Sequence, residues 1–342
     1  MEKVVYILGA GFSAPLGIPV MSNFIVKAKD LYFSDQEKYG HFDEIFTLLN
    51  QMSVIKNYFK TDLYNIEEIL SILEMNNYLS GSSDSEKFKV FLNDVIEHYT
   101  PIEKNVESLP GNWYDFVFGR GPTRGYVNFV AELFNLSIRK IGSSNNTDLI
   151  FEPIKNPNVD YSVISLNYDL VLENALYFLS NNYYNSKHIS FNKDLEDVPN
   201  TVRLSKLHGC IELGNIVPPT WNKSSNSQLA NTWKAAQKQL REANHIRIIG
   251  YSLPISDSYM KYMIKSSLLE SKHLKSLDVI TLDPTGEVKE RYDDFIDFNY
   301  YKFKNGNVTN YLENLKPQSD FSNRGERIYN LLETTHSDFM YS

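Results

Sequence analysis

The first 24 residues contain a short apolar strand that runs directly into a glycine-rich turn. The run Val4–Leu8 is apolar and rich in β-branched residues, as a strand buried inside a parallel sheet requires. Gly9–Ala14 follows at once and fits G-x-G-x-x-G/A. In a dinucleotide-binding fold Gly9 allows the tight turn, Gly11 lets the backbone approach a pyrophosphate, and Ala14 permits close helix–strand packing. This stretch therefore predicts a nucleotide-binding α/β fold.

The residues after the turn depart from an ordinary dinucleotide fold. We expect a helix to open near Ser13 and to direct its free N–H groups at the phosphates. Pro15 and then Gly17–Pro19 interrupt the helix that such a fold normally continues here. Because the motif alone is only moderately specific, the alternative of a glycine-rich turn without a ligand stays open.

Length, charge and cysteine content narrow the class of protein. The 342 residues, 42% of them hydrophobic, suffice for one large domain or two modest ones. A net charge of −8 does not favour binding to nucleic acid. No apolar run approaches the roughly 20 residues of a membrane span, and the chain enters a strand too early for a signal peptide. Cys210 is the only cysteine, which excludes an intramolecular disulfide or a multi-cysteine zinc site. We expect a soluble cytoplasmic protein.

Helical periodicity dominates the next part of the chain. Asn65 is a predicted N-cap with Glu68 three residues later, and a further helix is expected over about Gly125–Ile141. We predict that residues 25–149 form a helical insertion or lid between two parts of one domain, residues 1–24 and 150–306. Residues 307–342 are predicted to form a C-terminal helical tail.

An alternation of strands and helices follows the predicted helical insertion. It predicts a Rossmann-like, doubly wound and mostly parallel sheet with helices on both faces. Ligands of such sheets lie at the carboxyl ends of the strands, and polar residues follow each predicted strand there. Besides 4–8, the predicted strands are 163–166, 202–207, 245–249 and 277–282.

Four of these segments, in the same order along the chain, resemble sirtuin motifs. GAGFSAPLGIP resembles the G-A-G-x-S…G-I-P motif, and Ser165–Asp169 resembles T-Q-N-I-D. Lys206–Gly209 looks like the H-G motif, and Gly250–Leu253 stands where sirtuins have G-T-S. The resemblance covers most of residues 1–20 and 160–300. It is closest to the sirtuin-like NAD-degrading proteins of bacterial anti-phage systems, such as the Thoeris NADase subunit and the partners of HerA-type helicases. The stretch Ile216–Lys223 strengthens this choice.

The resemblance implies NAD as substrate and names the residues that bind it. Cleavage of the nicotinamide–ribose bond passes through an oxocarbenium-like state, and its leaving group is already cationic. Asn167 can bind a ribose hydroxyl and orient water, while His208 can accept a proton near neutral pH. These two are the predicted catalytic residues. The predicted NAD-binding residues are Gly9, Ala10, Gly11, Phe12, Ser13, Gly17, Pro19, Asp169, Gly250, Ser252 and Asp283.

Structural explanations compete at three of these positions. Asp169 is equally well placed to cap the helix expected from residue 170, and Asp283 stands before Pro284 as a turn residue. A lone histidine such as His208 is more often structural, although its position after a strand and before a glycine favours function.

Departures from the sirtuin pattern bear on the reaction. One cysteine cannot build the four-cysteine zinc ribbon of the deacylases, so we expect no zinc. The G-I-P motif continues with Val20–Ser22 where sirtuins have Asp and Arg, and Leu166 replaces Gln. We predict an NAD+ glycohydrolase that depletes NAD+ during phage infection. A non-catalytic NAD or ADP-ribose sensor is the alternative, and a protein deacylase is less favoured. The resemblance also implies a homo-oligomer controlled by a HerA-type ATPase, another operon partner or a phage-derived trigger.

Overall fold

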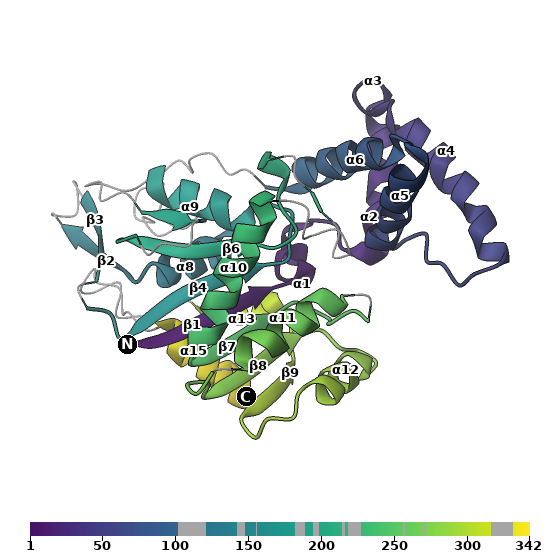
Figure 1. Ribbon diagram of the computed structural model, residues 1–342. Coiled ribbons are helices and arrows are strands. Elements are labelled where there is room, and N and C mark those ends of the chain that lie inside the picture. The colour runs from purple at the N-terminus through teal and green to yellow at the C-terminus, as the bar shows by residue number, and fades with distance from the viewer. Residues whose placement is uncertain are drawn as a thin grey trace.

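The computed structural model describes residues 1–101, 121–141, 148–154, 156–181, 189–193, 198–213, 216–217, 227–255, 257–269, 271–315 and 331–342 (Figure 1). Its centre is a seven-stranded sheet in the order β5-β6-β4-β1-β7-β8-β9, and every neighbouring pair is parallel. This confirms the predicted Rossmann-like α/β fold and places all five predicted strands in one sheet. The strands are β1 Glu2–Leu8, β4 Val159–Ser165, β5 Ser190–Asn192, β6 Thr201–Lys206, β7 His245–Ile249, β8 Ser276–Thr281 and β9 Tyr301–Asn305.

Helices cover both faces of this sheet, which explains the apolar run in β1. Val5 and Ile7 belong to the core beneath α10 (Ser227–Glu242), α11 (Ser258–Leu268) and α12 (Glu287–Phe295). Val4, Tyr6 and Leu8 face the opposite core, whose helices are α8 (Pro122–Leu133), α9 (Val171–Asn181), α13 (Val308–Glu313) and α15 (Leu331–Tyr341). Alternate residues of one strand thus face two different cores, as expected of a doubly covered parallel strand.

The helical block, residues 24–99, has a hydrophobic core of its own and lies to the right of the sheet in Figure 1. Asn65 caps its fourth helix, because its side-chain oxygen accepts from the backbone N–H groups of Glu67 (3.1 Å) and Glu68 (3.0 Å). Tyr168 and Ile211 from the sheet side join the same core. The helices are α2 Phe24–Ser34, α3 Gln36–Tyr39, α4 Phe42–Met52, α5 Ile66–Ser80 and α6 Asp84–Tyr99.

The prediction of one helix over Gly125–Ile141 is wrong in its second half. The helix begins at Pro122 and ends at Leu133, and Asn135 then adopts a left-handed conformation with φ 49° that breaks the helix. Leu136–Ile141 forms β2 and pairs antiparallel with β3, Asp148–Pro153. Apolar residues continued at helical spacing, so the sequence did not reveal the hairpin. The short edge strands β5 and β9 were also not predicted.

Other expectations concern the division of the chain. α8 packs in the core of the sheet and not with α2–α6, so the region 25–149 contains elements of two different cores. The proposed division into domains stays a prediction. The sequence also predicts a loop at Leu109–Asn112 and an end of the helical region within the polar stretch Ser143–Thr147. These residues, and most of Ile216–Lys223, lie outside the described part of the chain. Within the described part of the chain, no helix is both long and apolar enough to cross a membrane.

The C-terminal helix α15 is tied to the middle of the sheet by buried polar groups. Arg247 of β7 donates twice to Glu333 of α15, at 2.8 and 2.6 Å, and once to the hydroxyl of Tyr6 at 2.8 Å. Tyr161 donates to the same Glu333 carboxylate at 2.8 Å. The described part of the tail therefore packs on the fold.

Candidate active site

The carboxyl ends of β1, β4 and β6 meet at one edge of the sheet. The backbone N–H of Leu166 donates to Leu8 at 2.9 Å, and that of Leu207 donates to Ser165 at 3.0 Å. The glycine turn after β1, the Asn167 turn after β4 and the His208 turn after β6 consequently lie side by side. Three of the segments that the sequence singled out thus converge on one edge.

Asn167 is held by its amide nitrogen. Nδ2 donates to the carbonyl oxygen of Gly9 and to Oγ of Ser13, each at 3.0 Å. A carbonyl oxygen can only accept, so these contacts fix which end of the amide faces the glycine turn. Oδ1 then points away from them, is buried, and has no hydrogen-bond partner among the described residues. A buried unpaired oxygen of this kind costs free energy and is a natural site for a ligand donor.

A small pocket of about 90 Å³ lies beside Asn167. Ile18, Pro19 and Met21, from the segment after Gly17, form one wall, and residues of the helical block form another. Pockets for drug-sized ligands measure about 300–1,000 Å³, so this one has room for no more than one end of a dinucleotide. Its described lining is Ala10, Ile18, Pro19, Met21, Phe24, Ile66, Glu67, Ile96, Leu166, Asn167, Tyr168 and Asp169.

Asp169 lines the pocket and also caps the following helix, which was the structural alternative to a role in binding NAD. Its Oδ1 accepts from the backbone N–H of Val171 at 3.1 Å, at the start of α9. Burial raises the pKa of the Asp169 carboxyl above its ordinary value, and the Lys206 charge opposes this shift. A hydrogen bond from the Ser13 hydroxyl also opposes it. Asp169 therefore orients the same Ser13 that accepts from Asn167.

Lys206 fixes the turn between β4 and α9. Its ammonium group donates to the backbone oxygen of Asp169 and, at 3.0 Å, to Glu173. The side chains of Lys206 and Glu173 are 7% and 19% exposed, so this ion pair is largely shielded from solvent. The backbone that carries Asn167 is therefore anchored at both ends, to the glycine turn and to Lys206.

His208 lies next to the pocket but is not among the described residues that line it. The side chain is buried, and its ring centroid is 6.1 Å from that of Tyr168, which does line the pocket. The backbone oxygen of His208 accepts from Val217 at 2.9 Å. The predicted base is thus the neighbour of a residue that lines the pocket.

The glycines of the first turn serve loop packing in this structure. A Cβ on Gly11 would lie 2.9 Å from the backbone oxygen of Gly250, and one on Gly9 would lie 2.6 Å from Cα of Tyr251. The N–H of Gly11 donates to Gly250 at 2.8 Å and the N–H of Gly9 donates to Ile249 at 3.0 Å, so neither is directed at a ligand. Replacing Gly11 with valine is accordingly expected to disturb the fold.

The helix after the turn also differs from expectation. α1 spans only Ala10–Ser13, so Ser13 ends this helix and does not open one. A 3₁₀ turn over Ala14–Leu16 follows, and Gly17 then adopts φ 88°, as the interruption by proline and glycine predicted. Phe12 is buried in the core against the rings of Tyr126 and Phe129.

The predicted residues on the far side of the sheet do not reach the pocket. Ser252 is exposed, and its backbone oxygen accepts from Arg291 at 3.1 Å. Asp283 accepts from the N–H groups of Gly286, Val288 and Lys289, which supports its alternative reading as a turn residue. Burial raises the pKa of Asp283, but these three hydrogen bonds outweigh it and leave the pKa below its ordinary value.

Sequence reasoning missed the contribution of the helical block to the pocket. Phe24, Ile66 and Ile96 supply apolar walls, and Glu67 supplies a second carboxylate beside Asp169. No local signal marked these residues, because their periodicity is that of ordinary amphipathic helices. Only the packing of α5 and α6 against the Tyr168 turn brings them to Asn167.

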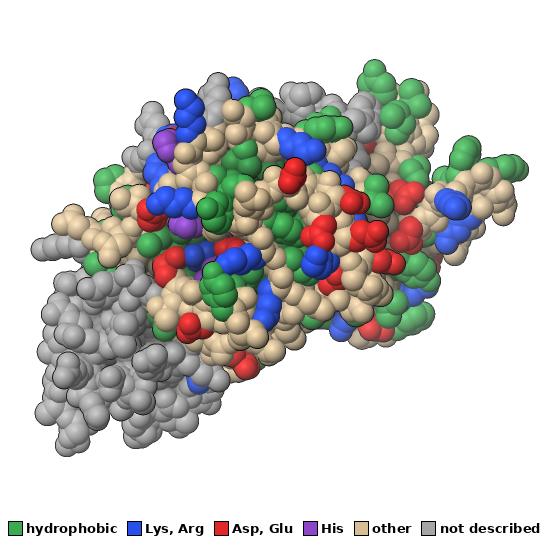
Figure 2. Space-filling model, turned by 90° about the horizontal axis from the view of Figure 1, so that it is seen from below, with side chains coloured by type: hydrophobic (Ala, Val, Ile, Leu, Met, Phe, Trp, Pro, Cys, Tyr) green, Lys and Arg blue, Asp and Glu red, His purple; other side chains and the backbone are tan. Residues whose placement is uncertain are grey.

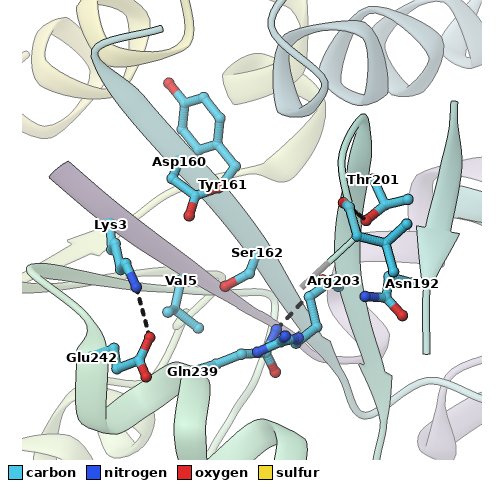
Figure 3. Close-up of a pocket in the computed structure, with 11 residues that line it drawn as sticks. Lys3, Val5, Asp160, Tyr161, Ser162, Asn192, Thr201, Arg203, Gln239 and Glu242 are labelled. Atoms are coloured by element: carbon cyan, nitrogen blue, oxygen red, sulfur yellow. Dashed lines mark hydrogen bonds and ion pairs between the residues drawn. The ribbon is translucent and has the colours of Figure 1, made fainter. Parts of the chain in front are cut away.

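The described residues contain no metal cluster. No group of three or more His, Cys, Asp or Glu side chains in that part of the chain is placed to hold a metal ion. A polar cavity of about 150 Å³ lies at the opposite, amino ends of β1, β4 and β6, where Lys3 pairs with Glu242 beside Gln239 and Arg203 (Figure 3). It is separate from the Asn167 pocket.

Comparison with known families identifies the part of the chain that carries Asn167 and His208. Residues 161–307 match the SIR2-like domain. This SIR2-like segment starts within β4 and extends beyond β9. No curated protein matches the chain by sequence.

Three solved structures are similar to the chain. One is a Sir2 in complex with the inhibitor EX-527, 2'-O-acetyl-ADP-ribose and a deacetylated p53 peptide, at 12% identity and a TM-score of 0.36 over 91% of each chain. The second is Sir2Tm bound to a propionylated peptide, at 13% identity and a TM-score of 0.37. The third is Sir2 with a p53 peptide and NAD+, at 13% identity and a TM-score of 0.38. The last two alignments each cover 91% of this chain and 90% of the other.

Proposed function

We propose that this chain is an NAD+ glycohydrolase, which cleaves NAD+ to nicotinamide and ADP-ribose with the ring end of the substrate in the Asn167 pocket. The observation that carries the proposal is the Asn167 amide, which is held at Nδ2, has a buried, unpaired Oδ1, and belongs to a residue that lines the pocket. The SIR2-like segment and the four sirtuin motifs support NAD+ as the ligand.

The proposed reaction breaks the bond between the nicotinamide nitrogen and C1' of the ribose. The bonding electrons pass to the ring, which leaves as neutral nicotinamide, and an oxocarbenium-like ribose remains. Water adds to C1' and loses one proton. Asn167 Oδ1 is the acceptor that orients this water or a ribose hydroxyl, an effect of positioning that is typically worth several kcal/mol.

We assign His208 the role of accepting the proton. It follows the strand next to that of Asn167, and its ring centroid lies 6.1 Å from that of Tyr168, which lines the pocket. Catalytic hydrogen bonds often tighten only when substrate is bound, so a side chain that does not line the pocket in the free protein is still a candidate for this role. Removal of such a base typically costs about 10²–10⁴-fold in rate.

Incubation of the purified chain with NAD+ tests the proposal. Nicotinamide and ADP-ribose are expected in equal amounts, with no acylated peptide required. NAD+ binding without products would favour the sensor, and acyl transfer from a peptide to ADP-ribose would favour the deacylase. Because effectors of this kind are commonly held inactive, the assay includes a cell extract from phage-infected bacteria as an activator.

We further propose that the protein is an oligomeric effector of anti-phage defence, controlled by an operon partner such as a HerA-type ATPase or by a phage-derived trigger. Hydrophobic side chains gather on the end of the molecule formed by the helical block, on the right of Figure 2. Light scattering that shows a monomer with full NADase activity would contradict the assembly. Among the described residues of the helical block, the most exposed large hydrophobic side chains, at 70–77%, are Phe33, Tyr58, Phe59, Tyr78 and Leu79.

A further inference from the structure

The pocket beside Asn167 has an unusual distribution of charge. Its described lining contains two carboxylates, Glu67 and Asp169, and no Lys, Arg or His. Most of the other lining residues are apolar. A phosphate group would be repelled here, whereas a flat apolar group with positive charge matches the walls.

The two carboxylates differ in their surroundings. Asp169 caps α9, is buried, and lies near the Lys206 charge. Glu67 is only half-buried and stands in the first turn of α5, on the wall that the helical block contributes. After burial, the Glu67 charge is the next cause that raises the pKa of the Tyr168 phenol, which places this charge close to the pocket wall.

We propose that Glu67 is a specificity-determining residue that selects the oxidised, cationic nicotinamide ring of NAD+ over the neutral ring of NADH. This inference rests on the proposed function and extends it, because it makes the helical block part of the substrate site. The pyridinium charge of NAD+ is the only positive charge on that ligand, and Glu67 is the carboxylate that the helical block contributes to the described lining.

The reaction itself constrains what Glu67 can do. Positive charge is present on the ring in bound NAD+ and moves to the adjacent ribose carbon as the bond breaks. A carboxylate near both atoms stabilises the bound substrate and the transition state to a similar extent. Such uniform binding lowers KM and leaves kcat nearly unchanged.

The test compares the affinities of NAD+ and NADH in the parent and in Glu67→Gln, measured by calorimetry. Glutamine keeps the shape and removes the charge, so the preference for NAD+ over NADH is expected to fall about tenfold, which corresponds to about 1.4 kcal/mol. Glu68→Gln is the matched control, since Glu68 stands in the same helical turn, is also half-buried, and does not line the pocket. Its preference is expected to equal that of the parent.

Glu67→Asp provides the complementary variant, because it keeps the charge and is expected to retain most of the preference. In turnover assays Glu67→Gln is expected to raise KM for NAD+ with little change in kcat. An unchanged NAD+/NADH preference in Glu67→Gln overturns the inference while leaving the NADase intact. If the parent binds neither nucleotide, the proposed function fails and this inference falls with it.

Discussion

Replacing Glu333 with glutamine removes the charge that balances a buried arginine in the middle of the sheet. The Arg247 side chain is 6% exposed and donates two hydrogen bonds to Glu333, whose side chain is 28% exposed. Removing one partner of a buried ion pair leaves the other charge uncompensated and typically costs about 3–5 kcal/mol. Glutamine still offers one oxygen to Arg247 and Tyr161, so we expect a loss near the lower end of that range, about 3 kcal/mol.

Urea denaturation of the full chain measures this loss, with Lys275→Met as control. Lys275 and Glu2 form an equally short pair at 2.6 Å, but their side chains are 55% and 43% exposed, and such surface pairs contribute about 0–1 kcal/mol. The double variant Arg247→Met, Glu333→Leu removes both charges and is expected to be more stable than either single charge-removing variant. A loss in Glu333→Gln no larger than that in Lys275→Met would refute the reasoning.

Two further predictions concern the packing of the loops and the response to pH. In thermal melts Gly250→Ala should destabilise the protein by several kcal/mol more than Gly81→Ala. Both glycines have a left-handed φ, +66° and +71°, but a Cβ on Gly250 would lie 2.2 Å from the Phe12 nitrogen, whereas the space around Gly81 is open. Equal losses of stability would contradict the close contact between the loops. Burial lowers the pKa of the His336 imidazole below its ordinary value of 6.5. As the pH falls, this imidazole is therefore protonated in the unfolded chain before it is protonated in the folded protein, and stability should fall as the pH drops below about 6.5. His336→Gln should flatten that fall by up to about 1.4 kcal/mol per pH unit, and an unchanged pH dependence of the urea midpoint would contradict it.

The fold was predictable where one short segment decided its own structure. The apolar, β-branched run of β1 fits only a strand covered on both faces, and the residues after β4 and β6 had to meet at one edge once the sheet was parallel. Asn65 caps α5 through its own side chain and its two nearest N–H donors, which is a local event.

The rest depended on contacts between distant segments. Leu136–Ile141 continues the helical spacing of α8, and only its pairing with Asp148–Pro153 makes it a strand. The glycine motif of the first turn is the same whether the backbone approaches a phosphate or, as here, the Gly250 loop, so the sequence does not distinguish the two. Glu67 lines the pocket because α5 packs beside it, and the sequence of α5 alone does not predict this packing.

The central claim is that Asn167 positions the reactants for cleavage of NAD+, and nicotinamide release tests it most directly. The rate is measured under activating conditions for the parent, Asn167→Ala and His208→Ala, with thermal melts of each. Asn174→Ala is the control, because Asn174 also donates through its amide to a backbone oxygen, that of Pro101 at 3.0 Å, but does not line the pocket.

We predict that Asn167→Ala melts within a few degrees of the parent and releases nicotinamide at least about 10²-fold more slowly, whereas Asn174→Ala keeps the parental rate. His208→Ala is expected to be similarly impaired, and the double variant hardly worse than either single one, because both residues act on one step. If the folded Asn167→Ala variant releases nicotinamide at the parental rate, the pocket beside Asn167 is not the site of the reaction.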